Sequence, residues 1–351
     1  PEVYRSGLGP LRLVQFGYTG PNRRLESVLR ILASLKHEVD FRFDVMGKLW
    51  DTGYLRNLVN QLGIEARVTF HGFVDESFLD QKLQQASEFF WDTVVNHRSV
   101  SIGGNSVREH FHPADDFSSM LESREGPETC NTHNMLRLTT LLFRAKPSAE
   151  LTDYYERALY NHILSAQHPK TGGLVYFTPM RPRHYRVSSV PENAFWCCVG
   201  SGIENPGRYS EFIYAQDEKT LFVNLFLAST LDWQEQGLKV RQSTDFPNSD
   251  SSQLTIESAP SKKITLKIRR PSWTTDAYKI TLNGKTVKAS VDDSGYSSIT
   301  RKWKKGDTLD IALPMQIRAE QLPDASPFYS FLYGPIVLAQ KIAEGETPGL
   351  F

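Results

Sequence analysis

The stretch YKITLNGKTVK, residues 278–288, places alternating apolar residues on both sides of the pair Asn283-Gly284. Asn-Gly favours a two-residue β-hairpin turn, because both residues readily adopt positive φ. Short β-type runs recur from about residue 218 onward at intervals of roughly 8 to 14 residues. They are TLFVNLFLAS (220–229), LKVRQST (238–244), SQLTIES (252–258), KITLKIR (263–269), SSITRKW (297–303) and DTLDIALP (307–314). The sequence therefore predicts an antiparallel β-sandwich domain over residues 218–351.

The preceding region, residues 87–217, is dominated by helix-type patterns. Apolar residues at helical spacing predict helices at four places, about 77–96, 132–145, 149–167 and 202–215. The segments 99–128 and 168–200 are rich in Gly, Pro and Ser, and loops of that length in a compact protein are usually functional. We therefore expect stacked antiparallel helices that carry functional loops.

The first part of the chain, residues 1–86, alternates strand-type and helix-type runs. The strand-type runs are LRLVQFGY (11–18), FRFDVMG (41–47) and ARVTFHGFV (66–74). Helix-type runs separate them, and this alternation is typical of a parallel sheet. The sequence predicts a Rossmann-like α/β fragment here.

Composition and charge narrow the classes of partner. The 351 residues include 40 Lys and Arg and 40 Asp and Glu, so the formal net charge is zero. A protein that mainly binds nucleic acid or an anionic membrane carries a basic field, which is absent here, so a neutral partner such as a sugar fits better. The apolar runs are far shorter than the roughly 20 residues that cross a bilayer. The compartment stays open, because the chain begins at Pro1.

The chain has three cysteines, Cys130, Cys197 and Cys198, an odd number that cannot form a closed set of disulfides. A disulfide between the adjacent Cys197 and Cys198 would force a strained ring. Reduced thiols that serve as metal ligands or as a nucleophile are therefore the favoured interpretation, and inert buried cysteines are the alternative.

A carboxylate accompanies these thiols, because the segment GPETCNTHN (126–134) places Glu128 two residues before Cys130. Residues at this spacing share a face only in extended backbone, so we expect both to lie just before the helix. The adjacent Cys197 and Cys198 can serve one centre only where the chain turns, which the glycines after them would allow. Three thiolates and one carboxylate form a tetrahedral set suited to Zn²⁺. The alternative is a pair of buried cysteines and a glutamate that caps a helix.

A second polar cluster lies in SIGGNSVREHFHP (101–113), which holds Asn105, Arg108, Glu109, His110 and His112. An acid, bases and hydrogen-bond donors on a flexible loop suit a site that binds a polyol and transfers protons. A solvated surface pair of Arg108 and Glu109 is the alternative. Histidines in loops more often form hydrogen bonds than bind metal. His133, beside the cysteine segment, is interpreted as a substrate contact or a helix-start residue.

These segments carry a family resemblance. The matching stretches are FFWDTVVNHRSVSIGGNSVREHF, GPETCNTHNML, FWCCVGSGIEN, IRRPSW and WKKGD. Residues from about 87 to 350 resemble glycoside hydrolase families 127 and 146, the β-L-arabinofuranosidases formerly grouped as a domain of unknown function. The resemblance implies an (α/α)₆ barrel followed by a β-sandwich. The earlier helices of that barrel have no counterpart, so we expect a partial helical barrel over 87–217.

The resemblance also implies residue roles. Glu128, Cys130, Cys197 and Cys198 correspond to the zinc ligands, Cys197 to the nucleophile and Glu109 to the general acid/base. It implies a zinc-dependent retaining hydrolase that releases β-L-arabinofuranose from an arabinose-containing glycan by double displacement, with sulfur in place of one carboxylate. For the substrate contacts, our expectation is Asn105, Arg108 and His133.

Residues 1–86 resemble the start of the donor-binding half of a family 4 glycosyltransferase, on the stretches RLVQFGYTGPNRRLESVLRIL, FDVMG and LGIEARVTFHGFV. The paired glutamates that hold the nucleotide-sugar in that family have no counterpart. Two alternatives therefore stand beside the hydrolase. One is a non-hydrolytic carbohydrate-binding or inactive fusion fragment with a structural zinc site, and the other is a nucleotide-sugar transferase fragment.

Overall fold

The computed structural model describes residues 10–19, 24–182, 184–190 and 192–340. The chain divides into two compact units, Pro1–Thr93 and Val94–Phe351, which are described separately. None of the helices in the described ranges is both long and apolar enough to cross a membrane.

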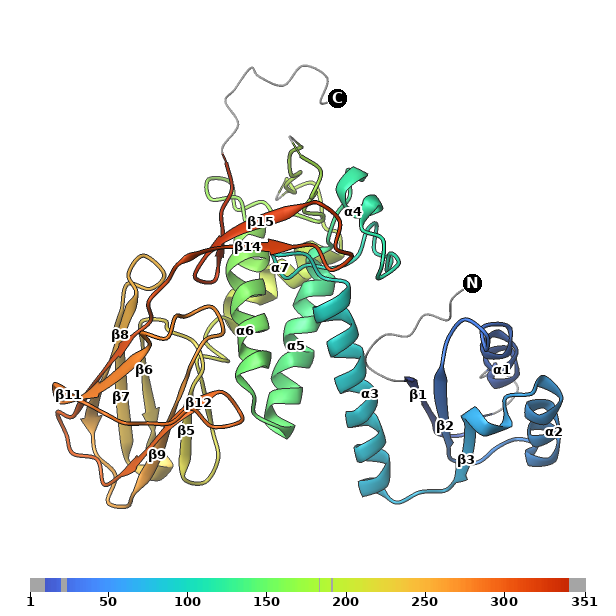
Figure 1. Ribbon diagram of the computed structural model, residues 1–351, viewed down its shortest axis with the longest axis horizontal. Helices are drawn as coiled ribbons and strands as arrows, with labels where there is room; N and C mark the ends of the chain where they lie inside the picture. The colour runs from blue at the N-terminus through green and yellow to red at the C-terminus, as the bar shows by residue number, and fades with distance from the viewer. Residues whose placement is uncertain (1–9, 20–23, 183, 191, 341–351) are drawn as a thin grey trace. The chain divides into compact units, whose positions relative to one another are not determined.

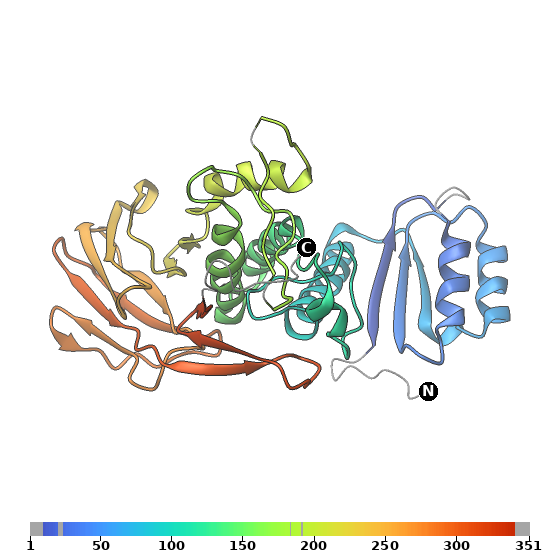
Figure 2. The same cartoon turned by 90° about the horizontal axis from the view of Figure 1, so that it is seen from above.

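The first unit contains a parallel sheet in the order β1-β2-β3. Its strands are β1 (Leu11–Phe16), β2 (Phe41–Met46) and β3 (Val68–Gly72), and the helices between them are α1 (Leu25–Ser34) and α2 (Thr52–Leu62). Both helices cover the same face of the sheet (Figure 2). Leu29, Phe41 and Leu55 are among the buried side chains between these layers. The predicted alternation of strands and helices is confirmed, although residues 20–23 of the glycosyltransferase-like stretch lie outside the described ranges.

A long helix, α3 (Glu76–His97), follows β3 and matches the helix predicted over 77–96. The second unit continues with α4 (Ser118–Glu122), α5 (Thr129–Ala145) and α6 (Ala149–Ala158). A π-helical turn, Leu159–Ile163, and a 3₁₀ turn, Leu164–Ala166, extend α6. The long axes of α5 and α6 lie side by side (Figure 1). The two predicted amphipathic helices are thereby confirmed, whereas a partial (α/α)₆ barrel remains a prediction.

The last helix of this region, α7, spans Cys197–Arg208. The prediction of a helix from about 202 to 215 was therefore wrong at both ends. Gly200 and Gly202 lower the helix propensity of the first two turns. Tertiary packing overrides that propensity, because Cys198, Val199 and Gly202 are buried along one side of the helix.

Two sheets follow, and both contribute side chains to one hydrophobic core that includes Val223, Val240 and Leu266. The four-stranded sheet has the order β12-β9-β5-β4, with β4 (Tyr214–Gln216), β5 (Thr220–Val223), β9 (Ile264–Arg269) and β12 (Tyr296–Arg301). The six-stranded sheet has the order β11-β10-β13-β8-β7-β6, with β6 (Ser229–Trp233), β7 (Leu238–Thr244), β8 (Ser251–Ser258), β10 (Lys279–Leu282), β11 (Lys285–Thr286) and β13 (Thr308–Ala312).

The Asn283-Gly284 hairpin is confirmed. Both residues have positive φ, 50° and 77°, and they join β10 to the antiparallel β11. The expectation of purely antiparallel pairing was wrong at one place, because β5 pairs with β9 in parallel register. Between these two strands the chain runs through β6, β7 and β8 of the other sheet, and it re-enters the first sheet in its original direction. The mixed α/β class is confirmed, and the sandwich as a fold type remains a prediction.

The chain then returns to the helical region in a third sheet, β14 (Ile317–Gln321), β15 (Tyr329–Tyr333) and β16 (Ile336–Val337). Ser330 of β15 contacts Ser101 through a 2.7 Å hydrogen bond between their hydroxyls. Arg157 of α6 forms a 2.6 Å ion pair with Glu320 of β14. The third sheet therefore packs on α6 and on the start of the polar segment 101–113 (Figure 1).

A buried ionic network joins α6 to β9. The guanidinium of Arg269 contacts the carboxylates of Asp153, at 2.6 Å, and of Glu156. Trp273 donates its indole N–H to the other oxygen of Glu156 at 2.8 Å. Removing one partner of such a buried pair typically costs about 3–5 kcal/mol, because the other charge is left uncompensated. The network fixes the helices next to the sheets.

Candidate functional site

The candidate site is built at the starts of two helices. Glu128 is the residue before α5, with extended backbone (φ −82°, ψ 135°), and Cys130 lies in the first turn of that helix. Cys197 and Cys198 are the first two residues of α7. Glu128 therefore lies just before the helix, as expected, but Cys130 does not, and the cysteine pair begins a helix instead of occupying a turn before one.

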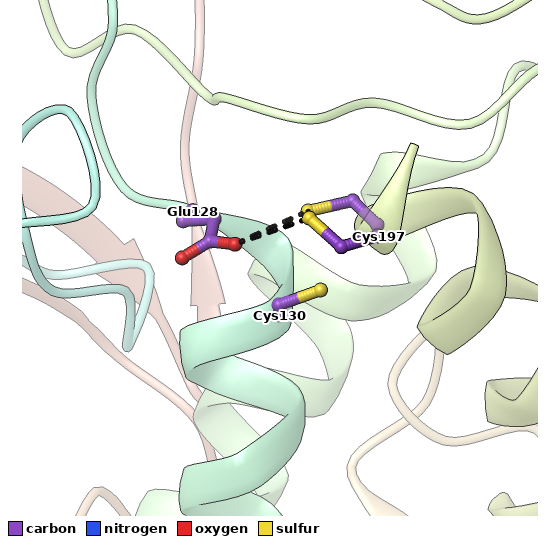
Figure 3. Close-up of side chains that lie close together, drawn as sticks. Glu128, Cys130 and Cys197 are labelled. Atoms are coloured by element: carbon purple, nitrogen blue, oxygen red, sulfur yellow. Dashed lines mark hydrogen bonds between the residues drawn. The ribbon is translucent and has the colours of Figure 1, made fainter. Parts of the chain in front are cut away.

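Residues 175–177 hold the start of α5 in place. Thr129 donates its backbone N–H to the carbonyl oxygen of Tyr176 at 3.0 Å and its hydroxyl to that of Val175 at 2.8 Å. Glu128 forms an isolated antiparallel bridge with Phe177. The side chain of Glu128 is thereby directed toward the start of α7 (Figure 3).

Glu128, Cys130, Cys197 and Cys198, which we call the Glu/Cys cluster, offer four ligand atoms that all lie within 4.8 Å of one another. The two sulfurs of Cys197 and Cys198 are 3.9 Å apart. Glu128 Oε1 lies 3.7 Å from Cys197 Sγ and 3.6 Å from Cys198 Sγ (Figure 3). The cluster could hold a metal ion.

These separations fit a tetrahedral zinc ion. With Zn–S distances of about 2.3 Å, two sulfurs on one tetrahedron are separated by about 3.8 Å. The separation of 3.9 Å between Cys197 and Cys198 matches that edge. Thiolates and a carboxylate are also donors that Zn²⁺ accepts. The three cysteines are free thiols, as the sequence favoured.

The members of the cluster differ in burial. Glu128 and Cys198 are buried, Cys130 is partly buried, and Cys197 is exposed. The positive ends of α5 and α7 both face the cluster, which stabilises negative charge on its ligands. Cys197 is thus the sulfur that a molecule from solvent can reach.

The cluster also shifts the pKa values of its members. A hydrogen bond from Cys198, assisted by one from Ser201, lowers the pKa of Cys130 to about 7. The same hydrogen bond with Cys130, together with burial, raises the pKa of Cys198. Burial raises the pKa of Glu128, and the nearby charge of Glu109 adds to that rise. The shared hydrogen bonds therefore favour a single thiolate in the cluster.

Tyr176 connects the cluster to Glu109. The Cys197 sulfur lies 3.2 Å from the Tyr176 hydroxyl, and that hydroxyl donates to the Glu109 carboxylate. Hydrogen bonding to Cys197 and to Glu109 raises the pKa of Tyr176, so it remains protonated. The sequence patterns do not identify Tyr176 as a site residue. They indicate only that it lies in the long loop 168–200, and loops of that length are usually functional.

Glu109 occupies an unusual backbone segment. Ser106, Arg108 and Glu109 all have positive φ, at 75°, 51° and 68°. Non-glycine residues rarely adopt this conformation, and such strain clusters at functional sites. Asn131 of α5 donates its side-chain amide to the Ser106 hydroxyl at 2.8 Å, which ties the segment to the helix that carries the cluster.

The other candidate residues are placed differently. Asn105 is buried, and its side-chain nitrogen has no hydrogen-bond partner among the described residues. Arg108 is exposed and lies 3.2 Å from Glu125. His133 is buried on α5, and its Nδ1 lies 2.7 Å from the Oδ1 of Asn205. Its ring therefore contacts α7 at a position after the cluster.

Two loop histidines face backbone oxygens. His110 Nδ1 lies 2.5 Å from the carbonyl oxygen of Arg108, and His112 Nδ1 lies 2.6 Å from that of Pro113. Neither belongs to the metal-type group that the described residues contain. The expectation that these side chains form hydrogen bonds matches these contacts.

Two family models match this chain, and one of them covers the candidate site. The model described as β-L-arabinofuranosidase, GH127 catalytic domain, matches residues 73–211, and the GH127 middle-domain model matches residues 220–315. The chain belongs to glycoside hydrolase family 127. The GH127 resemblance read from the sequence is confirmed, and the Glu/Cys cluster and Glu109 lie within the catalytic-domain match. The glycosyltransferase-like reading of residues 1–86 stays a prediction.

The individual relatives are longer than this chain. The non-reducing end β-L-arabinofuranosidase of Bifidobacterium longum subsp. longum is 25% identical over 256 residues, which are 68% of this chain and 38% of that protein. A GH127 β-L-arabinofuranosidase from Geobacillus stearothermophilus T6 superposes with a TM-score of 0.61 at 22% identity, over 74% of this chain and 44% of that one. A second GH127 β-arabinofuranosidase gives a TM-score of 0.61 at 25% identity with the same coverage. The chain spans less than half the length of these relatives.

Proposed function

We propose that this protein is a zinc-dependent retaining glycoside hydrolase that releases β-L-arabinofuranose from glycans. One observation carries the proposal: the Glu/Cys cluster, at the starts of α5 and α7, is linked through Tyr176 to a second carboxylate, Glu109. GH127 membership and the arabinofuranosidase relatives support the reaction class and the sugar.

The Glu/Cys cluster would hold the Zn²⁺ through one carboxylate oxygen and three sulfurs. A bound zinc ion keeps its cysteine ligands deprotonated at neutral pH. Cys197 is the exposed member of the cluster. It is therefore the thiolate that approaches a sugar from the solvent side.

In the first step, the Cys197 sulfur attacks the anomeric carbon and forms a C–S bond while the bond to the leaving oxygen breaks. Glu109 gives its carboxyl proton to that oxygen, so the leaving group departs as an alcohol. In the second step, the Glu109 carboxylate takes a proton from water. That water attacks the anomeric carbon and displaces the sulfur, and two inversions give net retention.

Tyr176 would hold both reacting groups in position. Its hydroxyl lies between the Cys197 sulfur and the Glu109 carboxylate. A donor that stays protonated restricts the Glu109 side chain and directs one carboxylate oxygen toward the cluster. Asn105, Arg108 and His133 remain proposed substrate contacts, with an arabinose-containing oligosaccharide as the partner.

The test is hydrolysis of a nitrophenyl β-L-arabinofuranoside by the zinc-loaded protein, with the anomeric configuration of the first product read by NMR. We expect β-L-arabinofuranose as the first product, and a covalent adduct on the peptide that contains Cys197 in a single-turnover digest. An inverted product would contradict double displacement. Bound zinc without any hydrolysis would favour the non-hydrolytic alternative.

A further inference from the structure

We infer that Ser201 holds the sulfur of Cys130 through a hydrogen bond and thereby increases the affinity of the Glu/Cys cluster for its metal. The inference rests on the proposed metal site and deepens it by adding a positioning residue outside the ligand set. Ser201 belongs to α7, one turn after the cysteine pair.

The geometry places the Ser201 hydroxyl between two acceptors. Its Oγ lies 3.2 Å from Cys130 Sγ, and 3.4 Å from the carbonyl oxygen of Cys198 in its own helix. The hydroxyl has a single proton and can donate it to one acceptor at a time. Hydrogen bonds to ionised acceptors are roughly twice as strong as those between neutral groups. Once Cys130 is a thiolate, Ser201 therefore donates to the sulfur.

This contact crosses between the helices that supply the ligands. Cys130 lies on α5, whereas Cys197 and Cys198 lie on α7. The next residue of α7, Gly202, packs closely against Leu174, because a Cβ at this position would lie 2.6 Å from a methyl carbon of that side chain. Ser201 thus fixes the sulfur from one helix relative to the two sulfurs from the other.

Hydrogen bonds of this kind orient metal ligands, and their removal typically costs about 10–100-fold in metal affinity. We therefore expect Ser201→Ala to weaken zinc binding by about 10–100-fold. Ser201→Thr keeps the hydroxyl and should stay close to the wild type. Ser210→Ala, at an exposed position just after α7, is the matched control and should leave the affinity unchanged.

The experiment is a competition for Zn²⁺ between the full chain and a chromophoric chelator at one fixed pH, with all four proteins. A second readout is the thiolate-to-cobalt charge-transfer band of the Co²⁺-loaded proteins. We expect this band to move to lower energy in Ser201→Ala, because the sulfur loses a hydrogen bond. The circular dichroism spectrum of the metal-free Ser201→Ala protein should match that of the wild type, because the variant keeps its fold.

Equal zinc affinity and an unchanged cobalt band in Ser201→Ala would overturn the inference, and leave the proposed metal site intact. An equal loss of zinc affinity in Ser201→Thr would also overturn it, because the hydroxyl would not be the cause. If the wild type binds no zinc, the proposed function fails first, and this inference fails with it.

Discussion

Cys197 and Glu109 contact the same Tyr176 hydroxyl, but Cys197 lies at the start of a helix and Glu109 lies in a loop. Cys197 begins α7, a helix whose first turn packs against neighbouring segments. Glu109 lies on an exposed loop in which three non-glycine residues have positive φ. The thiol is therefore positioned by helix packing. The carboxylate is positioned by two hydrogen bonds, one from Asn131 to Ser106 of its loop and one from Tyr176 to Glu109 itself.

This difference separates two tasks that the proposed reaction requires. A metal site needs four ligands at fixed separations, and helix ends provide fixed positions. An acid/base gives a proton to the leaving oxygen and later takes one from the water that replaces it, so an exposed loop position that solvent can reach suits it. The comparison predicts that substitutions at helix ends act on metal and nucleophile together, whereas loop substitutions act on proton transfer.

The largest expected effect comes from Cys197→Ala. Removing the nucleophile should lower turnover of every substrate by about 10⁴-fold or more. Glu109→Ala should lower turnover of unactivated arabinosides by about 10²–10⁴-fold, and affect the first step on a nitrophenyl arabinoside much less, because that leaving group needs little protonation. Steady-state and single-turnover kinetics on both substrates measure the difference. Wild-type turnover by Cys197→Ala with zinc still bound would exclude sulfur as the nucleophile.

The sequence predicted the Glu/Cys cluster and the Glu109 loop to different extents. The chain has three cysteines, one of them two residues after Glu128 and the other two adjacent to each other, so the cluster could be predicted from residue types and spacing. Glu109 could be assigned only through the family resemblance, because an exposed Arg-Glu pair on a loop is common. Tyr176 was missed, because its contacts depend on how residues 175–177 pair with the start of α5. The start of α7 was not predicted, because Gly200 and Gly202 lower the helix propensity of a segment that tertiary packing stabilises as a helix.

Tyr176→Phe removes the hydroxyl between the two regions and tests whether they act together. A hydrogen bond to a charged group is worth about 1.5–3 kcal/mol, so kcat/KM should fall by about 10–150-fold. Zinc content should not change, because Tyr176 is not in the Glu/Cys cluster. Tyr329→Phe, exposed on β15, serves as the control for losing a hydroxyl. Loss of zinc together with activity would show that Tyr176 supports the metal site instead.

Gly104→Ala perturbs the loop at its base. A Cβ at this position would lie 2.6 Å from the Cβ of Pro127 and 2.9 Å from Nδ1 of His162, so neighbouring groups must shift. We expect a loss of about 1–3 kcal/mol in the free energy of unfolding, typical of overpacking. Gly200→Ala, on α7 with open space around its Cβ, should be neutral or slightly stabilising. Equal effects in urea unfolding would show that the loop base is not tightly packed.

His162, under the base of this loop, predicts a pH dependence of stability. Burial lowers the pKa of His162 to about 3, and its Nδ1 lies 2.8 Å from the Thr132 hydroxyl. The unfolded chain binds a proton below about pH 6.5 that the folded chain does not bind, so stability falls as the pH decreases. The slope is at most about 1.4 kcal/mol per pH unit between pH 6 and 4. Urea unfolding of His162→Gln should give a smaller slope, and the exposed control His110→Gln should keep it. An unchanged slope in His162→Gln would contradict the prediction.

The most direct test of the account is the zinc content of the purified protein. Elemental analysis should give about one zinc ion per folded wild-type chain, as expected of one tetrahedral ligand set. The double variant Cys130→Ala, Cys198→Ala, which removes a sulfur from each helix, should retain almost none. Zinc retained undiminished in that folded double variant would contradict the assignment of the Glu/Cys cluster as the metal site.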